Sequence, residues 1–132
     1  MKSQLVVNAV TLEILCVRVD KGGVNDLTLL RTSDVHIHPL TLLRADGGYQ
    51  GYGKQHKNIV LPHKKPRKGE LTNEQRAENK ERARARLVVE HIIRRLKVFR
   101  ILKEVYRHRR KRFALRLSLL AGLYNLDLAR QP

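Results

Sequence analysis

The first part of the chain shows short apolar runs of the kind that form strands. Residues 4–9 and 13–19 are rich in Val, Ile and Leu and alternate in part with polar side chains. A short turn separates the two runs, and Lys21-Gly22-Gly23 stops the second. Apolar runs joined in this way are typical of paired antiparallel strands. The pattern therefore predicts a β-hairpin at the start of the chain.

The next segments predict a short helix, two further strands and a loop. Asn25 is a suitable N-cap, and leucines follow it at positions that can pack. Residues 40–45 form an apolar run that ends on Asp46 and two glycines, as a short buried strand followed by a turn would. A further strand is expected within 55–61. Residues 62–71 then combine proline, glycine and basic side chains, which predicts a basic loop.

A long amphipathic helix is predicted over 72–102, either in one piece or broken near Ala83. Thr72 or Asn73 can cap it. At about 100° per residue, its apolar side chains between 89 and 99 form one stripe. Off that stripe, and within about 40° of one another, lie three residues with charged side chains: Arg86, Glu90 and Lys97. A last helix is predicted over 111–128.

The order of these elements describes an α/β layer fold with a mixed sheet. We expect one domain, with residues 1–61 as a β-rich half, 62–71 as a basic loop and 72–132 as a basic helical half. A chain of 132 residues that is 42% hydrophobic can bury one core. It shows no apolar run of about 18 residues and no leader pattern, so we expect a cytoplasmic protein with no membrane partner.

The net charge is large, and the excess positive charge lies in the second part of the sequence. The net charge is +16, and residues 1–53 hold as many acids as bases, so the excess lies in 54–132. A field of one sign favours a polyanion, above all nucleic acid, which is bound with release of counterions. An acidic membrane surface is the weaker alternative, because the basic helices also carry a core stripe.

Two carboxylates each allow two interpretations. Glu90 could form an ion pair with Arg86 or Arg94, one helical turn away, or it could bind a metal ion with basic neighbours aimed at phosphates. Asp46 could be an ordinary turn aspartate, or a ligand at a strand end where glycines let a substrate approach. Carboxylate oxygens are what Mg²⁺ prefers, and phosphodiester chemistry with two metal ions needs several of them.

Four stretches of the sequence, taken together and in order, carry a resemblance. They are ADGGYQG (45–51), PHKKPRKGELT (62–72), RLVVEHIIRRLKVFRIL (86–102) and YRHRRKRFALRLSLLAGLYNLDL (106–128). They resemble the C-terminal part of an IS5-type insertion-sequence transposase, a DDE superfamily endonuclease. The resemblance covers nearly the whole chain, and the agreement of four separate stretches makes it specific.

The resemblance implies a ribonuclease-H-like mixed sheet with flanking helices, lacking the first strand, and a site of three acids. Asp46 would be the second acid and Glu90 the third, both catalytic and both ligands of Mg²⁺ or Mn²⁺. A related signature of insertion-sequence transposases places Arg four residues before the Glu and Lys seven after it, which matches Arg86 and Lys97. The tyrosine of that signature is replaced by Ala83, a departure from the family pattern.

The first acid of the family has no counterpart in this sequence. In the family it lies on a strand upstream of the segment that resembles residues 2–16, and neither Asp20 nor Asp26 takes that place. We therefore expect a truncated or split transposase, inactive alone, whose parent enzyme cleaves DNA strands and transfers them. A separate N-terminal fragment could supply the missing Asp. A homo-oligomer acting on transposon ends and target DNA in a prokaryotic nucleoid is the expected setting.

Basic residues around these acids are expected to contact the DNA backbone. They are Arg86, Lys97, Arg94, Lys64, Lys65, Arg107, Arg109, Arg110, Lys111 and Arg112. Two other classes of protein remain open. A non-catalytic basic nucleic-acid-binding protein would explain the charge without using Asp46 or Glu90, and its affinity would depend steeply on salt but not on Mg²⁺. The other is a folded remnant with no function.

Overall fold

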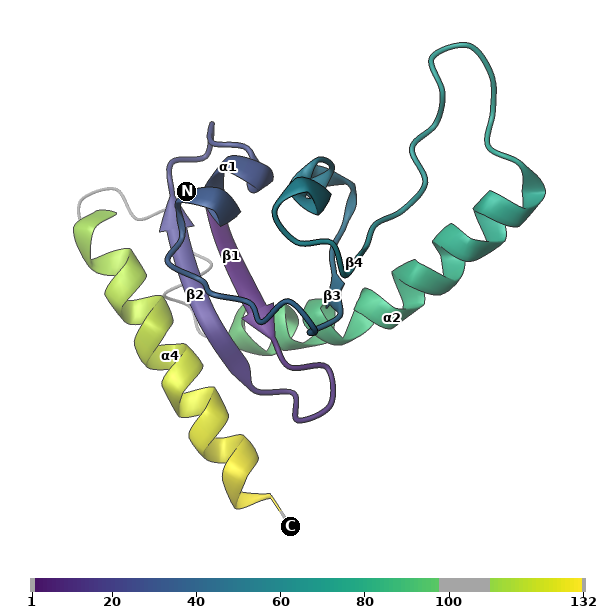
Figure 1. Cartoon of the computed structure of the whole chain (residues 1–132). Helices are drawn as coiled ribbons and strands as arrows, with labels where there is room; N and C mark the ends of the chain where they lie inside the picture. The colour runs from purple at the N-terminus through teal and green to yellow at the C-terminus, as the bar shows by residue number, and fades with distance from the viewer. Residues whose placement is uncertain (1, 98–109, 132) are drawn as a thin grey trace. The chain divides into compact units, whose positions relative to one another are not determined.

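The computed structural model describes residues 2–97 and 110–131 and contains both helices and strands (Figure 1). In chain order the elements are β1 (Lys2–Val7), β2 (Ile14–Asp20), α1 (Asp26–Thr32), β3 (Leu43–Arg44), β4 (Ile59–Val60), α2 (Asn73–Lys97) and α4 (Arg110–Arg130), with short 3₁₀ helices η1 (Gly47–Tyr49) and η2 (Tyr52–Lys54). The chain forms two compact units. Unit 1 consists of Met1–Val24 and Val88–Pro132, and unit 2 of Asn25–Leu87. In the described residues, no helix has the length and apolar character needed to cross a bilayer.

Unit 1 is a β-hairpin packed against helices. Strands β1 and β2 are antiparallel, paired from Lys2 with Asp20 to Val7 with Ile14, and the register shifts at Val7. The core of the unit combines the second strand with the apolar stripes of both helices. Its buried residues are Ile14, Ile92, Leu96, Leu117, Leu120, Ala121 and Tyr124.

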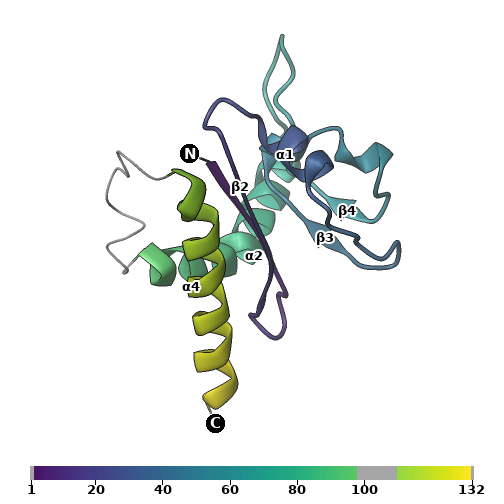
Figure 2. The ribbon, with the colours of Figure 1, turned by 90° about the vertical axis from the view of Figure 1, so that its left-hand side faces the viewer.

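Helix α4 runs beside β2 (Figure 1 and Figure 2). Polar contacts also join it to the hairpin. The side-chain amide of Asn125 accepts a hydrogen bond from the Ile14 amide at 2.9 Å and donates one to the Ile14 carbonyl at 2.9 Å. It thus satisfies both backbone groups at the start of β2, as a neighbouring strand would. The Tyr124 hydroxyl donates to the Leu12 carbonyl at 3.2 Å. These contacts fix the helix along the strand direction.

In unit 2, local side-chain caps fix the starts of both helices, and the strands are short. The Asn25 side chain accepts from the Thr28 amide at 2.7 Å at the start of α1, which buries Leu29 completely. Strands β3 and β4 pair in parallel over two residues each. At the start of α2, the Gln75 amide donates to the Thr72 hydroxyl at 3.2 Å, and the Thr72 amide donates to the Gln75 side chain at 3.1 Å. This reciprocal pair is a capping box, and Thr72 is the N-cap.

The order of elements confirms the prediction, but the strand expected over 40–45 was wrong in length and burial. Only β3 is extended and paired, and Leu40 and Leu42 are 83% and 49% exposed. The Thr41 amide donates to the His38 carbonyl at 2.9 Å and so closes a turn where the strand was expected to begin. A turn at this point leaves Leu40 no strand partner.

Two further predictions concern the continuity of α2 and the arrangement of the strands in sheets. The helix runs through Ala83 without a break, because this stretch holds neither proline nor glycine. The fold is a mixed α/β fold, as expected. The described strands form one antiparallel and one parallel pair, in two separate sheets, where a single mixed sheet was predicted. The parallel pair is only two residues long, which limits how far it can extend a sheet.

Candidate functional site

Asp46 lies at the end of β3 and begins the turn that carries η1. Its side chain accepts a hydrogen bond from the Gly48 amide at 2.9 Å, and its carbonyl accepts from the Tyr49 amide at 3.2 Å. The side chain is therefore an N-cap, oriented by the turn itself. It is also exposed. An exposed carboxylate held in one direction can still bind a ligand through its second oxygen.

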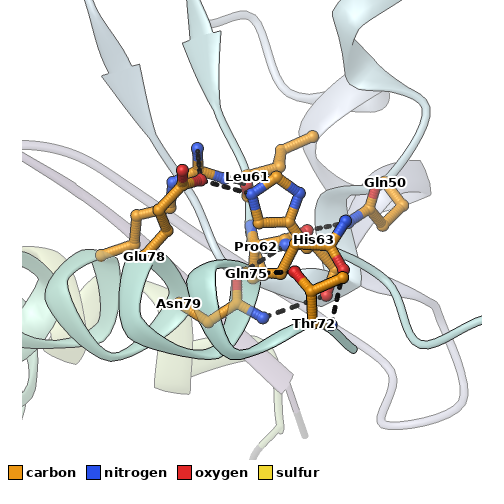
Figure 3. Close-up of polar contacts among 9 residues, drawn as sticks. Gln50, Leu61, Pro62, His63, Thr72, Gln75, Glu78 and Asn79 are labelled. Carbon is orange, nitrogen blue, oxygen red and sulfur yellow. Dashed lines mark hydrogen bonds and ion pairs between the residues drawn. The ribbon is translucent and has the colours of Figure 1, made fainter. Parts of the chain in front are cut away.

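A side-chain hydrogen bond and two glycines determine the conformation of the turn after Asp46. The Gln50 side chain donates to the Pro62 carbonyl at 2.8 Å (Figure 3). Gly51 has a φ of 97°, a left-handed conformation that glycine adopts without strain. At position 48, a Cβ would lie 2.3 Å from the Asp26 Oδ2 atom, so any residue other than glycine would force the Asp26 carboxylate to move. Asp46 and Gly48, but not Gly47, are thus the residues on which the close packing of this turn depends.

Asp26 is a residue at this turn that sequence reasoning had set aside. It is the first residue of α1, and its carboxylate lies beside Gly48. Burial, and after it the nearby charges of Asp26 and Asp46, raise the pKa of the Tyr49 phenol to about 12. Only the tertiary packing of α1 on η1 brings Asp26 here, so the local sequence pattern held no signal of it.

The loop that follows β4 is fixed to the first part of α2 by side chains of the helix (Figure 3). Asn79 accepts from the His63 amide at 2.7 Å and donates to the His63 carbonyl at 3.2 Å. The His63 ring contacts the Glu78 carboxylate at 2.5 Å, and Arg82 donates to the Leu61 carbonyl at 2.5 Å. The hydrogen bond from His63 is the main cause that lowers the pKa of Glu78. The segment predicted as a mere loop therefore starts in a defined conformation.

Glu90 and its neighbours lie on helix α2. Glu90 and Arg94 are exposed, and in the described part of the molecule Glu90 forms no ion pair with Arg86 or Arg94. The ion-pair alternative is therefore not seen. Arg86 is half-buried, and its Nε atom is buried with no hydrogen-bond partner among the described residues. Lys97 is the last residue of α2, and its side chain lies outside the described part.

The two predicted acids belong to different units, Asp46 to unit 2 and Glu90 to unit 1. Across the described residues, no three His, Cys, Asp or Glu side chains group as a metal site would require. Both carboxylates are exposed oxygen donors, and such donors fit Mg²⁺ or Mn²⁺.

The other predicted DNA contacts are spread over a loop and a helix. Lys64 and Lys65 are exposed in the loop after β4, and Arg112 is exposed on α4. Arg110 and Lys111 begin α4, with side chains outside the described part. Arg107 and Arg109 lie outside the described residues altogether.

Comparison with known proteins agrees with the resemblance read from the sequence. A family model for the DDE superfamily endonuclease matches residues 1–125. The chain is 46% identical over 129 residues to a probable transposase for insertion sequence element IS702 from Microchaete diplosiphon, a match that covers 98% of this chain and 47% of that protein. The chain thus spans about half the length of this relative. No solved structure matches. The chain belongs to the DDE superfamily endonucleases.

Proposed function

We propose that this chain carries two of the three acids of a DNA transposase site, Asp46 and Glu90. The observation that carries the proposal is the Asp46 turn, in which the Gly48 amide orients an exposed carboxylate at a strand end. The family supports the same assignment, because its endonucleases generally depend on divalent metal ions held by acids. The resemblance implies a ribonuclease-H-like core, in which the second and third acids of the family belong to one site.

The reaction would be hydrolysis of a phosphodiester at the element end, followed by attack of the freed 3′-hydroxyl on target DNA. Mg²⁺ or Mn²⁺ held by the acids would supply activation of the nucleophile and stabilisation of the leaving oxygen. Asp46 and Glu90 would provide oxygen ligands. Arg86, Arg94 and Lys97 would hold phosphates of the cleaved strand, since guanidinium and ammonium groups bind phosphate through charge-assisted hydrogen bonds.

Two exposed carboxylates are fewer than the family site uses. We infer that a third acid comes from a polypeptide segment outside these 132 residues, and that the chain alone cleaves DNA negligibly. The basic residues Lys64, Lys65 and Arg112 would bind the DNA backbone without reading its sequence. Paired element ends would favour a homo-oligomer that acts on DNA in the prokaryotic nucleoid.

A plasmid-nicking assay tests this function. The purified chain is incubated with supercoiled plasmid and Mn²⁺, first alone and then together with the part of the IS702 relative that this chain does not match, which would supply the missing acid. Nicking is expected only in the mixture. Both Asp46→Asn and Glu90→Gln should abolish it, because each removes a charged metal ligand while conserving shape.

Matched variants and conditions separate this function from the alternatives. Arg84→Ala removes an exposed charge from the same helix and should leave nicking within about twofold. Nicking by the chain alone that vanishes in Glu90→Gln would overturn the split-site proposal. DNA affinity that is salt-steep, with no nicking in any mixture and no effect of Mn²⁺, would instead identify a non-catalytic DNA-binding protein.

A further inference from the structure

Unit 2 contains a pocket beside the Asp46 turn. It has a volume of about 340 Å³ and is lined by residues of β3, β4 and the first part of α2. This volume lies at the lower end of the range of about 300–1,000 Å³ found for small-ligand sites. Its charged lining residues are Arg44, Arg82, Arg86, Glu78 and Glu81. The pocket therefore combines three guanidinium groups with two carboxylates.

Two of these charged groups already have partners. The Glu78 carboxylate contacts the His63 ring at 2.5 Å and Arg82 at 3.3 Å. Arg82 also donates to the Leu61 carbonyl at 2.5 Å. Glu78 and Arg82 thus compensate one another and hold the wall of the pocket. Glu81 is exposed, so water solvates its charge.

The other two arginines have hydrogen-bond donors to offer. The Nε atom of Arg86 is buried and, within the described residues, has no partner. A buried donor in this state has lost its water without gaining a bond, which is uncommon in folded proteins. Arg44 ends β3 and is exposed, and its side chain makes no hydrogen bond or ion pair in the described part of the chain. The pocket therefore presents two guanidinium groups suited to an anion.

We propose that Arg44 and Arg86 together bind one phosphodiester group of the DNA backbone in this pocket. A guanidinium binds phosphate oxygens through a planar fork of donors, and two forks can hold the two free oxygens of one diester. Arg44 precedes Asp46 by two residues, and Arg86 precedes Glu90 by one turn of α2. The inference rests on the proposed function for the role of Arg86, and it adds Arg44 and the location.

The test is an NMR titration of the arginine Nε–H resonances in the full chain, without metal ions. The probe is the dinucleotide TpT, which has a single phosphodiester. Arg44 and Arg86 should shift with one shared dissociation constant, and exposed Arg84, on the same helix but outside the pocket, should not. Arg44→Ala and Arg86→Ala should each weaken binding about tenfold, the size expected for a charged hydrogen bond. In the Arg86→Ala background, Arg44→Ala should add little, because the two groups share one phosphate.

Control variants and probes distinguish phosphodiester binding from lost folding and from binding of free phosphate. Arg86→Lys keeps the charge without the fork and should bind TpT weakly, which distinguishes lost contacts from lost folding. The neutral methylphosphonate analogue of TpT should not bind. Saturation by inorganic phosphate but not by TpT would overturn the proposal in favour of a free-phosphate site, as would equal shifts at Arg84 or no shift at Arg44 and Arg86. Neither metal nor the third acid is needed, so failure here and failure of plasmid nicking are independent.

Discussion

Unit 1 and unit 2 are each stabilised internally by a different kind of interaction. Unit 1 has an apolar core in which Ile92 and Leu96 of α2 are 3% and 2% exposed. Unit 2 has one fully buried side chain, Leu29, and fixes its loops with hydrogen bonds from side chains to backbone. The proposed acids divide in the same way. Glu90 belongs to the unit held by packing, and Asp46 to the unit held by polar contacts.

This difference decides how each acid responds to change. Burial of apolar surface is non-directional, so a core tolerates small shifts while it keeps its elements together. A hydrogen bond depends on the direction of donor and acceptor, so one lost partner can release a whole turn. We expect unit 1 to lose stability through cavities and unit 2 through single polar substitutions.

The largest expected effect is a cavity in unit 1. Leu96→Ala should lower the free energy of unfolding by about 2–5 kcal/mol, because the removed methyl groups leave a space that the core fills only in part. Hydrogen exchange of the β1 and β2 amides measures it. Leu115→Ala on α4, at a side chain that is 60% exposed, is the control and should change stability by less than about 0.5 kcal/mol. Equal effects of the two variants would contradict the packing assigned to unit 1.

The matching substitution in unit 2 removes polar contacts and no core volume. Asn79→Ala leaves the half-buried amide and carbonyl of His63 without partners and should cost about 1–3 kcal/mol. The amide of His63 should lose its protection from hydrogen exchange. Lys80→Ala, at the next and exposed position of α2, should leave that protection unchanged. If Asn79→Ala behaved like Lys80→Ala, hydrogen bonds would not be what holds this loop.

The two units also differ in how much of them could be predicted from sequence. The hairpin and the helices of unit 1 follow from the spacing of apolar residues, and the Asn25 and Thr72 caps follow from side-chain chemistry at helix starts. The strand over 40–45 was predicted too long, because the local pattern does not reveal the turn at His38. Partners far apart in sequence, such as Arg82 and the Leu61 carbonyl, leave no local pattern.

The candidate site shows the same limit. Asp46 and Glu90 were predicted from residue type, spacing and resemblance, and Asp46 does begin a turn at a strand end. The approach of Asp26 to that turn, and the pocket lined by Arg44 and Arg86, arise from the packing of elements that are distant in sequence. Periodicity assigns a residue to a face, but it does not say which other element that face meets.

A smaller effect is expected from a methyl group in the Asp46 turn. In Gly48→Ala the new Cβ would meet Asp26, whose carboxylate must move away, at a cost of about 1 kcal/mol. With that charge farther off, the pKa of Tyr49 should fall below its value of about 12. Tyrosinate absorbance during alkaline titration measures the change, with Tyr49→Phe to identify the late-titrating group.

The neighbouring glycine supplies the control for this prediction. A Cβ at position 47 would lie 3.9 Å from the Pro62 ring, an ordinary contact, so Gly47→Ala should leave the Tyr49 titration as in the unchanged protein. The double variant Gly48→Ala with Asp26→Ala should recover most of the lost stability, because the clash is gone. An unchanged Tyr49 titration in Gly48→Ala would show that Asp26 does not set the environment of this turn.

The smallest expected effect is a difference between the two units in how their amide protection depends on pH. The hydrogen bond from His63 lowers the pKa of Glu78 below its ordinary value of 4.5, so its contribution to stability is fully present above pH 4.5 and is lost as the pH falls through the lower pKa of the folded state. The protection of the His63 amide should therefore decrease in acid, while that of the hairpin does not. In His63→Ala, carbon NMR of the Glu78 carboxyl should show its pKa returning towards 4.5, and Arg82→Gln should move it less, because Arg82 is the weaker cause. If the hairpin amides lost protection over the same pH range, the two units would not differ in the interactions that stabilise them. The Asp46 turn would then not depend on the polar contacts of unit 2 in particular.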